Sequence, residues 1–222
     1  SYEKQRRFIT DAGHELKTPM TIISADVDLA EMDCGENQWL IDIRRQTQRL
    51  TSLTTDLIYL SRMEEEQPRL SPIELPLSDA VEEIAQSFAA LATSQGKAFS
   101  IRVQPMLSYL GDEKAIRQLV SILLDNALKY SPEGGQLTLT LEKQGRGTLL
   151  TVTNTVDKPL ERAQLTRLFD RFYRTDQSRN SQTGGYGLGL SIAKRIVLAH
   201  KGKIRPDQPD SNTLAIVVNL SA

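Results

Sequence analysis

The sequence predicts an α+β protein in two parts: a long helical hairpin, then a domain in which helices cover one face of a sheet. Over residues 1–66, apolar side chains recur every three or four positions, which is the spacing of amphipathic helices. From residue 77 onward, helical segments are mixed with short strand-like runs bounded by turn residues. Strands grouped with helices in this way favour a two-layer sandwich.

The composition limits the classes of protein to be considered. The chain has 222 residues with a net charge of -1, so it lacks the excess of basic residues that is typical of nucleic-acid-binding proteins. Cys34 is the only cysteine, which excludes an internal disulfide and fits a reducing compartment. No apolar run approaches the roughly 18 residues of a membrane helix. Because the chain begins at Ser1 inside a helical pattern, we expect a cytoplasmic piece of a longer protein, with any membrane spans outside it.

The first predicted helix has one apolar face, which we expect to be buried. Its members are Ile9, Ala12, Leu16, Met20, Ile23, Val27 and Ala30. His14 lies two positions from both Ala12 and Leu16, which places its ring on the opposite, solvent-facing side. Pro19 has no N–H to give the carbonyl of Glu15, so the helix should bend or loosen beside His14.

A second helix should follow a tight turn at residues 33–36. Its apolar and small polar positions alternate spacings of three and four, as in a heptad seam. The seam consists of Leu40, Ile43, Thr47, Leu50, Thr54, Leu57 and Ser61, widened by Leu53 and Leu60. Two helices cannot bury both stripes, so we expect a homodimeric four-helix bundle; the alternative is packing against the rest of the same chain.

The remaining elements follow from caps, turns and periodicity. Pro68, Pro72 and Pro76 mark a linker over residues 67–76 with a short strand. Asp112 is the expected N-cap of a helix that ends at Tyr130. Helices are expected over 77–94, 112–130, 160–169 and 188–201, and strands over 99–103, 137–143, 149–154 and 214–220.

His14 has neighbours suited to nucleophilic chemistry. Glu15 can accept a hydrogen bond from one ring nitrogen and leave the other free, and Thr18 lies one turn on. The run Gly13-His14-Glu15-Leu16-Lys17-Thr18-Pro19 resembles the H-box of sensor histidine kinases, with Gly13 in place of the usual serine. The resemblance implies that the histidine takes the γ-phosphoryl group of ATP and passes it to an aspartate of a response regulator. It also implies catalytic roles for Glu15 and Thr18, the latter in regulator dephosphorylation.

The segment Leu123–Tyr130 resembles the N-box of the same family. Asn126 offers a neutral oxygen suited to Mg²⁺, and Lys129 lies on the same helical face, where it could reach phosphates. The resemblance places Tyr130 with them in the nucleotide site. Ile122 stands where related gyrase- and chaperone-type ATPases carry a water-activating glutamate, which disfavours a free-standing ATPase.

Two further segments resemble the G2 box and the F-box. Glycines that lead into a helix allow the backbone to approach a phosphate closely. The G2-like run is Gly184–Leu190, and the ATP contacts expected from it are Gly185, Gly187, Leu188 and Gly189. The F-box-like run Phe169–Arg174 places Arg174 near phosphates. The polar segment 173–183 between them would be a mobile lid.

The family's adenine-binding box is degenerate here. Neither glycine of the usual D-x-G-x-G is present. Asn154 is the best match to the aspartate, and Asp157 is a less favoured substitute. An asparagine carbonyl accepts the adenine hydrogen bond without charge assistance.

Together the boxes imply a phosphotransfer hairpin (1–66), a linker (67–76) and an ATP-binding domain of the histidine kinase, gyrase and chaperone type (77–222). The implied cofactors are ATP and Mg²⁺, and the implied partners are a second copy and a regulator receiver domain, not nucleic acid. The alternative is a catalytically weak pseudokinase or nucleotide-sensing scaffold. His200, at a helix C-terminus, should only interact with the helix dipole.

Overall fold

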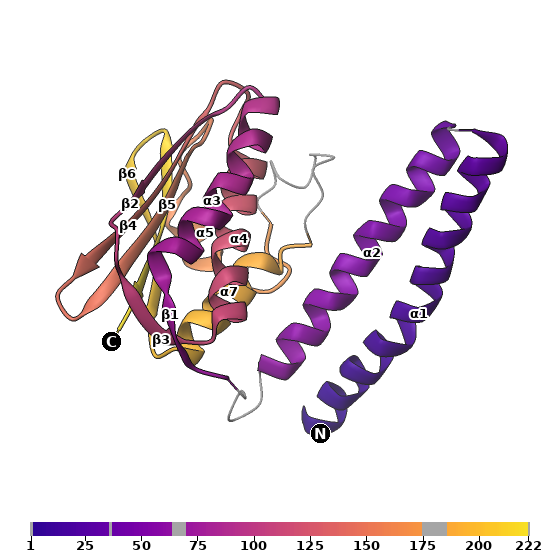
Figure 1. Ribbon diagram of the computed structural model, residues 1–222, viewed down its shortest axis with the longest axis horizontal. Coiled ribbons are helices and arrows are strands. Elements are labelled where there is room, and N and C mark those ends of the chain that lie inside the picture. The colour runs from indigo at the N-terminus through magenta and orange to yellow at the C-terminus, as the bar shows by residue number, and fades with distance from the viewer. Residues whose placement is uncertain (1, 36, 64–69, 175–185, 222) are drawn as a thin grey trace. The chain divides into compact units, whose positions relative to one another are not determined.

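The computed structural model describes residues 2–35, 37–63, 70–174 and 186–221, without the side chains of residues 2–12, 14, 60, 62 and 63 (Figure 1). The chain divides into two compact units, residues 1–68 and 69–222. Each unit is described by itself.

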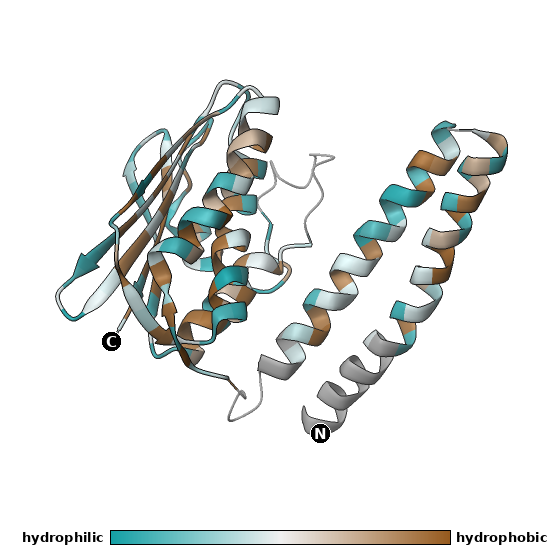
Figure 2. Ribbon diagram, viewed as in Figure 1, coloured by the Kyte–Doolittle hydropathy of each residue, from teal (hydrophilic) through white to brown (hydrophobic). Residues whose placement is uncertain are grey.

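The first unit is the predicted helical hairpin. Helix α1 (Tyr2–Cys34) and helix α2 (Gln38–Met63) lie side by side, and Figure 2 shows hydrophobic and hydrophilic residues alternating along the coloured part of each. Gly35 has φ +76° and its N–H donates to the Glu31 carbonyl at 2.9 Å, which ends α1 in the predicted turn. Helix α1 continues through Pro19, so whatever bend or loosening the proline causes does not interrupt the helix.

The two helices pack through a narrower face of α1 than the apolar pattern predicts. Met20 and Val27 are buried, but Leu16 and Ile23 are 53% and 44% exposed, so α2 covers only part of the predicted apolar face, as expected if a second hairpin is needed to bury the rest. Gly13 also belongs to the buried face, because a Cβ there would lie 2.7 Å from the Ile58 Cδ1 atom of α2. Periodicity locates an apolar stripe, but it does not predict the close approach of the helices at this glycine.

Small polar residues form the matching face of α2. Thr47, Thr54 and Ser61 are buried. The hydroxyls of Thr47 and Thr54 donate to the carbonyls of Ile43 and Leu50, each at 2.9 Å, so that burial leaves neither of these two donors unsatisfied. The larger apolar seam residues Ile43 and Leu50 stay about half exposed. Apolar side chains at heptad spacing are therefore left uncovered on both helices, and Leu16, Ile23, Ile43 and Leu50 are here called the uncovered stripe.

The second unit contains a five-stranded sheet in the order β2-β4-β5-β7-β6. Strand β2 pairs parallel with β4, and the other pairs are antiparallel. The strands are β2 (Ala98–Val103), β4 (Gln136–Gln144), β5 (Gly147–Thr155), β6 (Lys203–Asp210) and β7 (Thr213–Leu220). Strands β1 (Ile73–Pro76) and β3 (Ser108–Gly111) form a separate antiparallel pair.

Helices cover one face of the five-stranded sheet (Figure 1). They are α3 (Leu77–Ser94), α4 (Glu113–Tyr130) and α7 (Gly189–Ala199), and a short helix α5 (Arg162–Arg167) follows β5. Alternate residues of β5 and β7, such as Val152 and Ile216, are buried on the covered face. The predicted α+β sandwich is confirmed.

Two strands and one helix length differ from the sequence prediction. Strand β6 is not predicted, since Pro206 and Pro209 argue against a strand; it is accommodated as an edge strand that pairs only with β7. Strand β3, only four residues long, is also missed. Helix α5 is shorter than predicted and begins at a capping box formed by Glu161 and Gln164.

Candidate active site

The H-box segment lies within α1. His14 belongs to the helix, but its side chain is outside the described part of the chain. Glu15 and Thr18 are both exposed to solvent, one residue and one helical turn after it. Ile22, a further turn along, is 55% exposed. The helix therefore presents the predicted catalytic carboxylate and hydroxyl on its surface.

The N-box residues occupy the last turns of α4. Asn126 and Tyr130 are partly exposed, while the neighbouring Ala127 and Leu128 are buried and anchor the helix. The Lys129 Nζ atom lies 2.5 Å from Asp125 Oδ2, so the ammonium is engaged in an ion pair on its own helix. An exposed pair of this kind contributes at most about 1 kcal/mol, so exchanging Asp125 for a phosphate costs little.

Gly187 joins the G2 segment to the F-box. Its φ is +73°, and a Cβ there would lie 2.6 Å from the backbone carbonyl oxygen of Tyr173. The Phe172 N–H donates to the Gly187 carbonyl at 3.0 Å. Only glycine combines this backbone conformation with this close approach. The two boxes, predicted separately from the sequence, therefore meet at this residue.

The start of α7 presents backbone donors. The first N–H groups of a helix have no intrahelical partner, and the N-cap Leu188 is buried and offers no side-chain cap. Gly189 begins the helix, and a Cβ there would lie 3.4 Å from the Ile122 Cγ2 atom of α4. Asn126 follows Ile122 by one helical turn on the same face. The expected Mg²⁺ ligand is thus close to donors that suit phosphate.

The F-box packs its first aromatic residue and exposes the second. Phe169 is buried, whereas Phe172 is exposed with φ +58°. The Arg167 guanidinium carbon lies 4.6 Å from the centre of the Tyr173 ring, which holds the segment before Arg174. Arg174 is partly exposed. Gly185 and residues 175–183 of the predicted lid are outside the described residues.

Asn154 occupies the covered side of β5. It is 3% exposed, lies between Leu137 of β4 and Leu214 of β7, and its Nδ2 donates to the Thr155 carbonyl at 2.9 Å. The amide oxygen is then the atom that would accept from an adenine amino group. Asp157 lies beyond the end of β5 and is exposed. The two candidates thus differ in position: Asn154 is buried on the helix-covered face and Asp157 is exposed.

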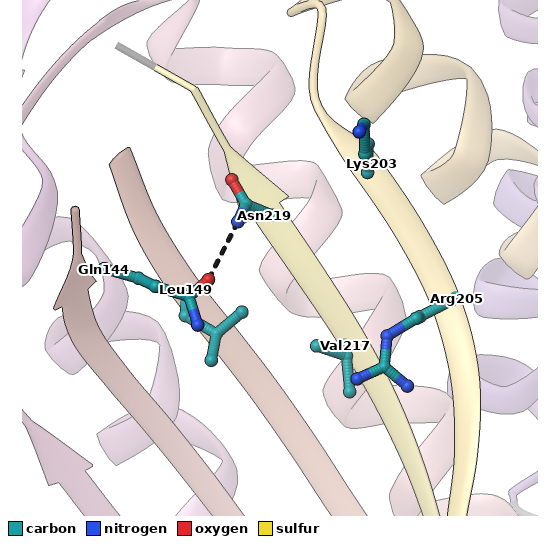
Figure 3. Close-up of a pocket in the computed structure, with 6 residues that line it drawn as sticks. All are labelled: Gln144, Leu149, Lys203, Arg205, Val217 and Asn219. Atoms are coloured by element: carbon teal, nitrogen blue, oxygen red, sulfur yellow. Dashed lines mark hydrogen bonds between the residues drawn. The ribbon is translucent and has the colours of Figure 1, made fainter. Parts of the chain in front are cut away.

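A surface hollow on the open face of the sheet lies away from these residues (Figure 3). Its volume is about 220 Å³, and it is lined by Gln144, Leu149, Lys203, Arg205, Val217 and Asn219. Asn219 Nδ2 donates to Gln144 Oε1 at 2.9 Å across its floor. None of the predicted site residues lines it, so the nucleotide motifs and this hollow are separate features.

His200 makes a second contact that the sequence does not predict. It caps the C-terminus of α7, and its Nδ1 lies 2.8 Å from the Ile196 carbonyl in the last turn, which agrees with the expected interaction with that helix end. The residue is only 7% exposed, and its Nε2 accepts a hydrogen bond from the Asp112 N–H at 3.0 Å. Its partner lies 88 residues earlier, beyond the reach of local sequence rules.

Asp112 confirms its predicted role as N-cap of α4. Its Oδ1 accepts from the Ala115 N–H and its Oδ2 from the Ser71 N–H, both at 3.0 Å. Partial burial would raise the pKa of the Asp112 carboxyl, but these backbone hydrogen bonds outweigh it and hold the pKa below its ordinary value. The carboxylate therefore stays charged at the start of α4.

Comparison with protein families identifies both units. Residues 4–66 match the His Kinase A (phospho-acceptor) domain, and residues 111–221 match the Histidine kinase-, DNA gyrase B-, and HSP90-like ATPase family. The chain belongs to the sensor histidine kinases of two-component systems. In the described residues, no helix is long and apolar enough to cross a membrane.

Individual relatives agree with this assignment. The chain is 33% identical over 217 residues to Sensor protein DltS of Streptococcus agalactiae serotype III (strain NEM316), covering 98% of this chain and 54% of DltS. It is 33% identical over 212 residues to Probable sensor protein PcoS of Escherichia coli, covering 94% of this chain and 45% of PcoS. The chain thus spans about half the length of these relatives.

A solved structure shares the fold. Full-length ShkA in complex with AMPPNP superimposes with a TM-score of 0.81 over 96% of this chain and 45% of that chain, at 22% sequence identity. At that identity the likeness concerns the fold. The arrangement of a helical hairpin followed by a helix-covered sheet is therefore one that histidine kinases adopt.

Proposed function

We propose that this chain is the kinase portion of a membrane-anchored sensor, which phosphorylates His14 from ATP and then an aspartate of a response regulator. The observation that carries the proposal is the meeting of the nucleotide motifs in the second unit. Gly187 contacts the backbone of Tyr173, and Gly189 approaches Ile122, one turn before Asn126. These contacts support a site in which the N-terminus of α7 would bind phosphate and Asn126 would bind magnesium, on the chain that carries the H-box.

In this mechanism His14 forms the covalent bond to the transferred phosphoryl group. The other site residues position ATP and neutralise its charge. A ring nitrogen of His14 attacks the γ-phosphorus, the bond to the bridging oxygen breaks, and ADP leaves with that electron pair. Glu15 orients the ring through the other nitrogen. The N–H groups that begin α7, with Lys129 and Arg174, hold the phosphates in place.

Asn126 fits the role of magnesium ligand. Among the described residues, no group of three or more His, Cys, Asp or Glu side chains could hold a metal. An ion at this site would therefore depend on the Asn126 oxygen, phosphate oxygens and water, which is a usual environment for Mg²⁺. When bound, the ion neutralises phosphate charge.

The uncovered stripe of the hairpin supports the proposed homodimer. Leu16 and Ile23 of α1 lie seven residues apart, as do Ile43 and Leu50 of α2, and all four are about half exposed. Trp39, one helical turn before Ile43, is 80% exposed and extends the apolar surface toward the start of α2. A second hairpin that covers this stripe would complete a four-helix bundle.

A different exposed surface of α1 remains for the regulator. Thr21, Ile22 and Ala25 follow the H-box and are all exposed. Ile22 is an apolar side chain among polar neighbours, which suits contact with a receiver domain. The dimer and the regulator would therefore use separate parts of the hairpin surface.

The proposal is tested by incubating the chain with γ-labelled ATP and Mg²⁺. We expect label on the protein that is lost in acid and kept in alkali, as phosphohistidine requires. ATP binding without label would favour the scaffold alternative, for which the relatives provide no support. ADP release without label would indicate simple hydrolysis.

Thr18 should serve dephosphorylation of the regulator. Its exposed hydroxyl lies one turn from His14 and can orient water, but it is not the phosphate acceptor. Thr18→Ala should keep autophosphorylation within about twofold and reduce regulator dephosphorylation by about tenfold or more, in line with the roughly 10²–10⁴-fold contribution of a positioned proton-transfer group. A parallel loss of both activities would show instead that Thr18 supports the helix.

Asn154 should read the adenine base without charge assistance. Asn154→Asp should strengthen ATP binding by roughly tenfold or less and sharpen the preference for ATP over GTP, because a charged acceptor strengthens a hydrogen bond by about 1 kcal/mol. Titration of both nucleotides against the two proteins measures this. Asp157→Asn is the matched control and should change neither affinity; an effect there alone would transfer the role to Asp157.

A further inference from the structure

The His200 ring makes two hydrogen bonds that lead to different helices. Nδ1 lies 2.8 Å from the carbonyl oxygen of Ile196 in its own helix, α7. Nε2 accepts from the backbone N–H of Asp112, the N-cap of α4, at 3.0 Å. Because a carbonyl can only accept, Nδ1 carries the ring proton and Nε2 is the acceptor. The ring thus links the end of α7 to the beginning of α4.

The surroundings of the ring are built for this link. Gly111 has no side chain, and a Cβ there would lie 2.8 Å from Tyr109 Cδ1 and 3.1 Å from His200 Cδ2. The Tyr109 hydroxyl donates to the His200 carbonyl at 3.3 Å. His200 and Tyr109 are both buried, and the bond from Tyr109 and the bond to Ile196 are buried with them, so leaving these groups unpaired would be costly. The bond from Asp112 is partly buried.

The same two helices meet again at the other end of α7. Gly189, the first residue of α7, approaches Ile122 near the middle of α4. Helices α4 and α7 therefore run antiparallel: His200 at the end of α7 bonds Asp112 at the start of α4, and Gly189 at the start of α7 packs on Ile122. The nucleotide residues Asn126 and Gly187–Gly189 all lie toward this second contact. A slip of α7 along α4 would change the separation of the phosphate donors from Asn126.

We propose that His200 is a positioning residue for nucleotide binding: through Asp112 it holds α7 in axial register with α4. This rests on the proposed function, because the register matters where ATP lies between these helices. His200 does not touch the nucleotide. It fixes the spacing of the groups that do.

Two substitutions separate the bonds of the ring. His200→Gln places an amide oxygen near the position of Nε2 and can still accept from Asp112, but it loses the bond to Ile196. His200→Asn keeps a donor near the position of Nδ1 and loses the bond to Asp112. The proposal requires that the glutamine variant binds Mg²⁺ and AMPPNP within about twofold of the original chain, and that the asparagine variant binds about tenfold more weakly, a typical coupling effect.

Ser78→Ala provides the control for general destabilisation. The Ser78 hydroxyl donates to the Gln104 carbonyl at 2.6 Å and accepts from the Leu107 N–H at 2.9 Å. Ser78 therefore also makes one buried and one partly buried hydrogen bond, like His200 with Ile196 and Asp112, but on α3. Ser78→Ala should lower the thermal stability by about as much as the His200 variants do, without changing the AMPPNP affinity. The affinity is measured at a temperature at which all variants are folded.

Amide hydrogen exchange tests the register without nucleotide. The Ile192 N–H, which donates to the Leu188 carbonyl at 3.0 Å, and the amides that follow it in α7 should exchange faster in the asparagine variant than in the glutamine or Ser78→Ala variants. Equal affinity and exchange in the two His200 variants, or weaker binding only in the glutamine variant, would overturn the proposal and leave His200 as a local helix cap. If the original chain binds no AMPPNP while the variants still differ in exchange as expected, the proposed function is overturned and the role of His200 in the helix register is not.

Discussion

Replacing His14 by glutamine should abolish ATP-dependent phosphorylation of the chain and leave nucleotide binding unchanged. Glutamine keeps a polar side chain of similar size but has no nucleophilic nitrogen. Removing a nucleophile can cost on the order of 10⁶ in rate, so the label should fall to background. His200, the only other histidine, cannot take its place, because both of its ring nitrogens are engaged in hydrogen bonds.

The measurement is incorporation of label from γ-labelled ATP, with AMPPNP affinity determined on the same preparations. Glu15→Gln is the matched neighbour on α1: it retains the nucleophile and should slow labelling without abolishing it. Nucleotide binding should be equal in all three proteins, because His14 and the nucleotide motifs belong to separate units. Acid-labile label that persists in the His14 variant would mean that another residue accepts the phosphate.

Features set by short-range rules were predictable from the sequence. The limits of α3, residues 77–94, agree with the prediction, as do the N-cap role of Asp112 and the turn that ends at Gly35. Periodicity, caps and turn residues act within a few positions, so the chain itself carries the information. The order of the H, N, F and G2 boxes likewise identified the family before any geometry was known.

Features that depend on distant partners were not predictable. The apolar spacing of α1 could not distinguish Leu16, which is exposed, from Gly13, which is buried against Ile58, because the choice depends on the other helix. Strand β6 is hidden by Pro206, which only an edge position tolerates. The bond from Asp112 to His200 spans 88 residues. In each case the deciding contact is tertiary.

The junction at Gly187 provides the second large expected effect. Gly187→Ala should weaken ATP binding by at least about a hundredfold. A residue with a Cβ pays roughly 1–2 kcal/mol for the left-handed conformation at φ +73°. Its Cβ would also lie 2.6 Å from the Tyr173 carbonyl oxygen. Since that oxygen is backbone, no change of rotamer relieves the clash, and the G2 and F-box segments must separate, breaking the bond from Phe172 to Gly187.

Gly145→Ala separates the two causes. Gly145 also has a positive φ, +60°, in the turn between β4 and β5, but a Cβ there would meet nothing within 4 Å. The control should therefore lose about 1–2 kcal/mol of folding free energy and keep its ATP affinity. Denaturant unfolding and AMPPNP titration of both variants measure the two effects independently. If Gly187→Ala loses stability like the control but still binds AMPPNP, contact between the two boxes is not what forms the phosphate site. If Gly187→Ala loses AMPPNP affinity and Gly145→Ala does not, the close backbone approach at Gly187 is what holds the phosphate donors in place.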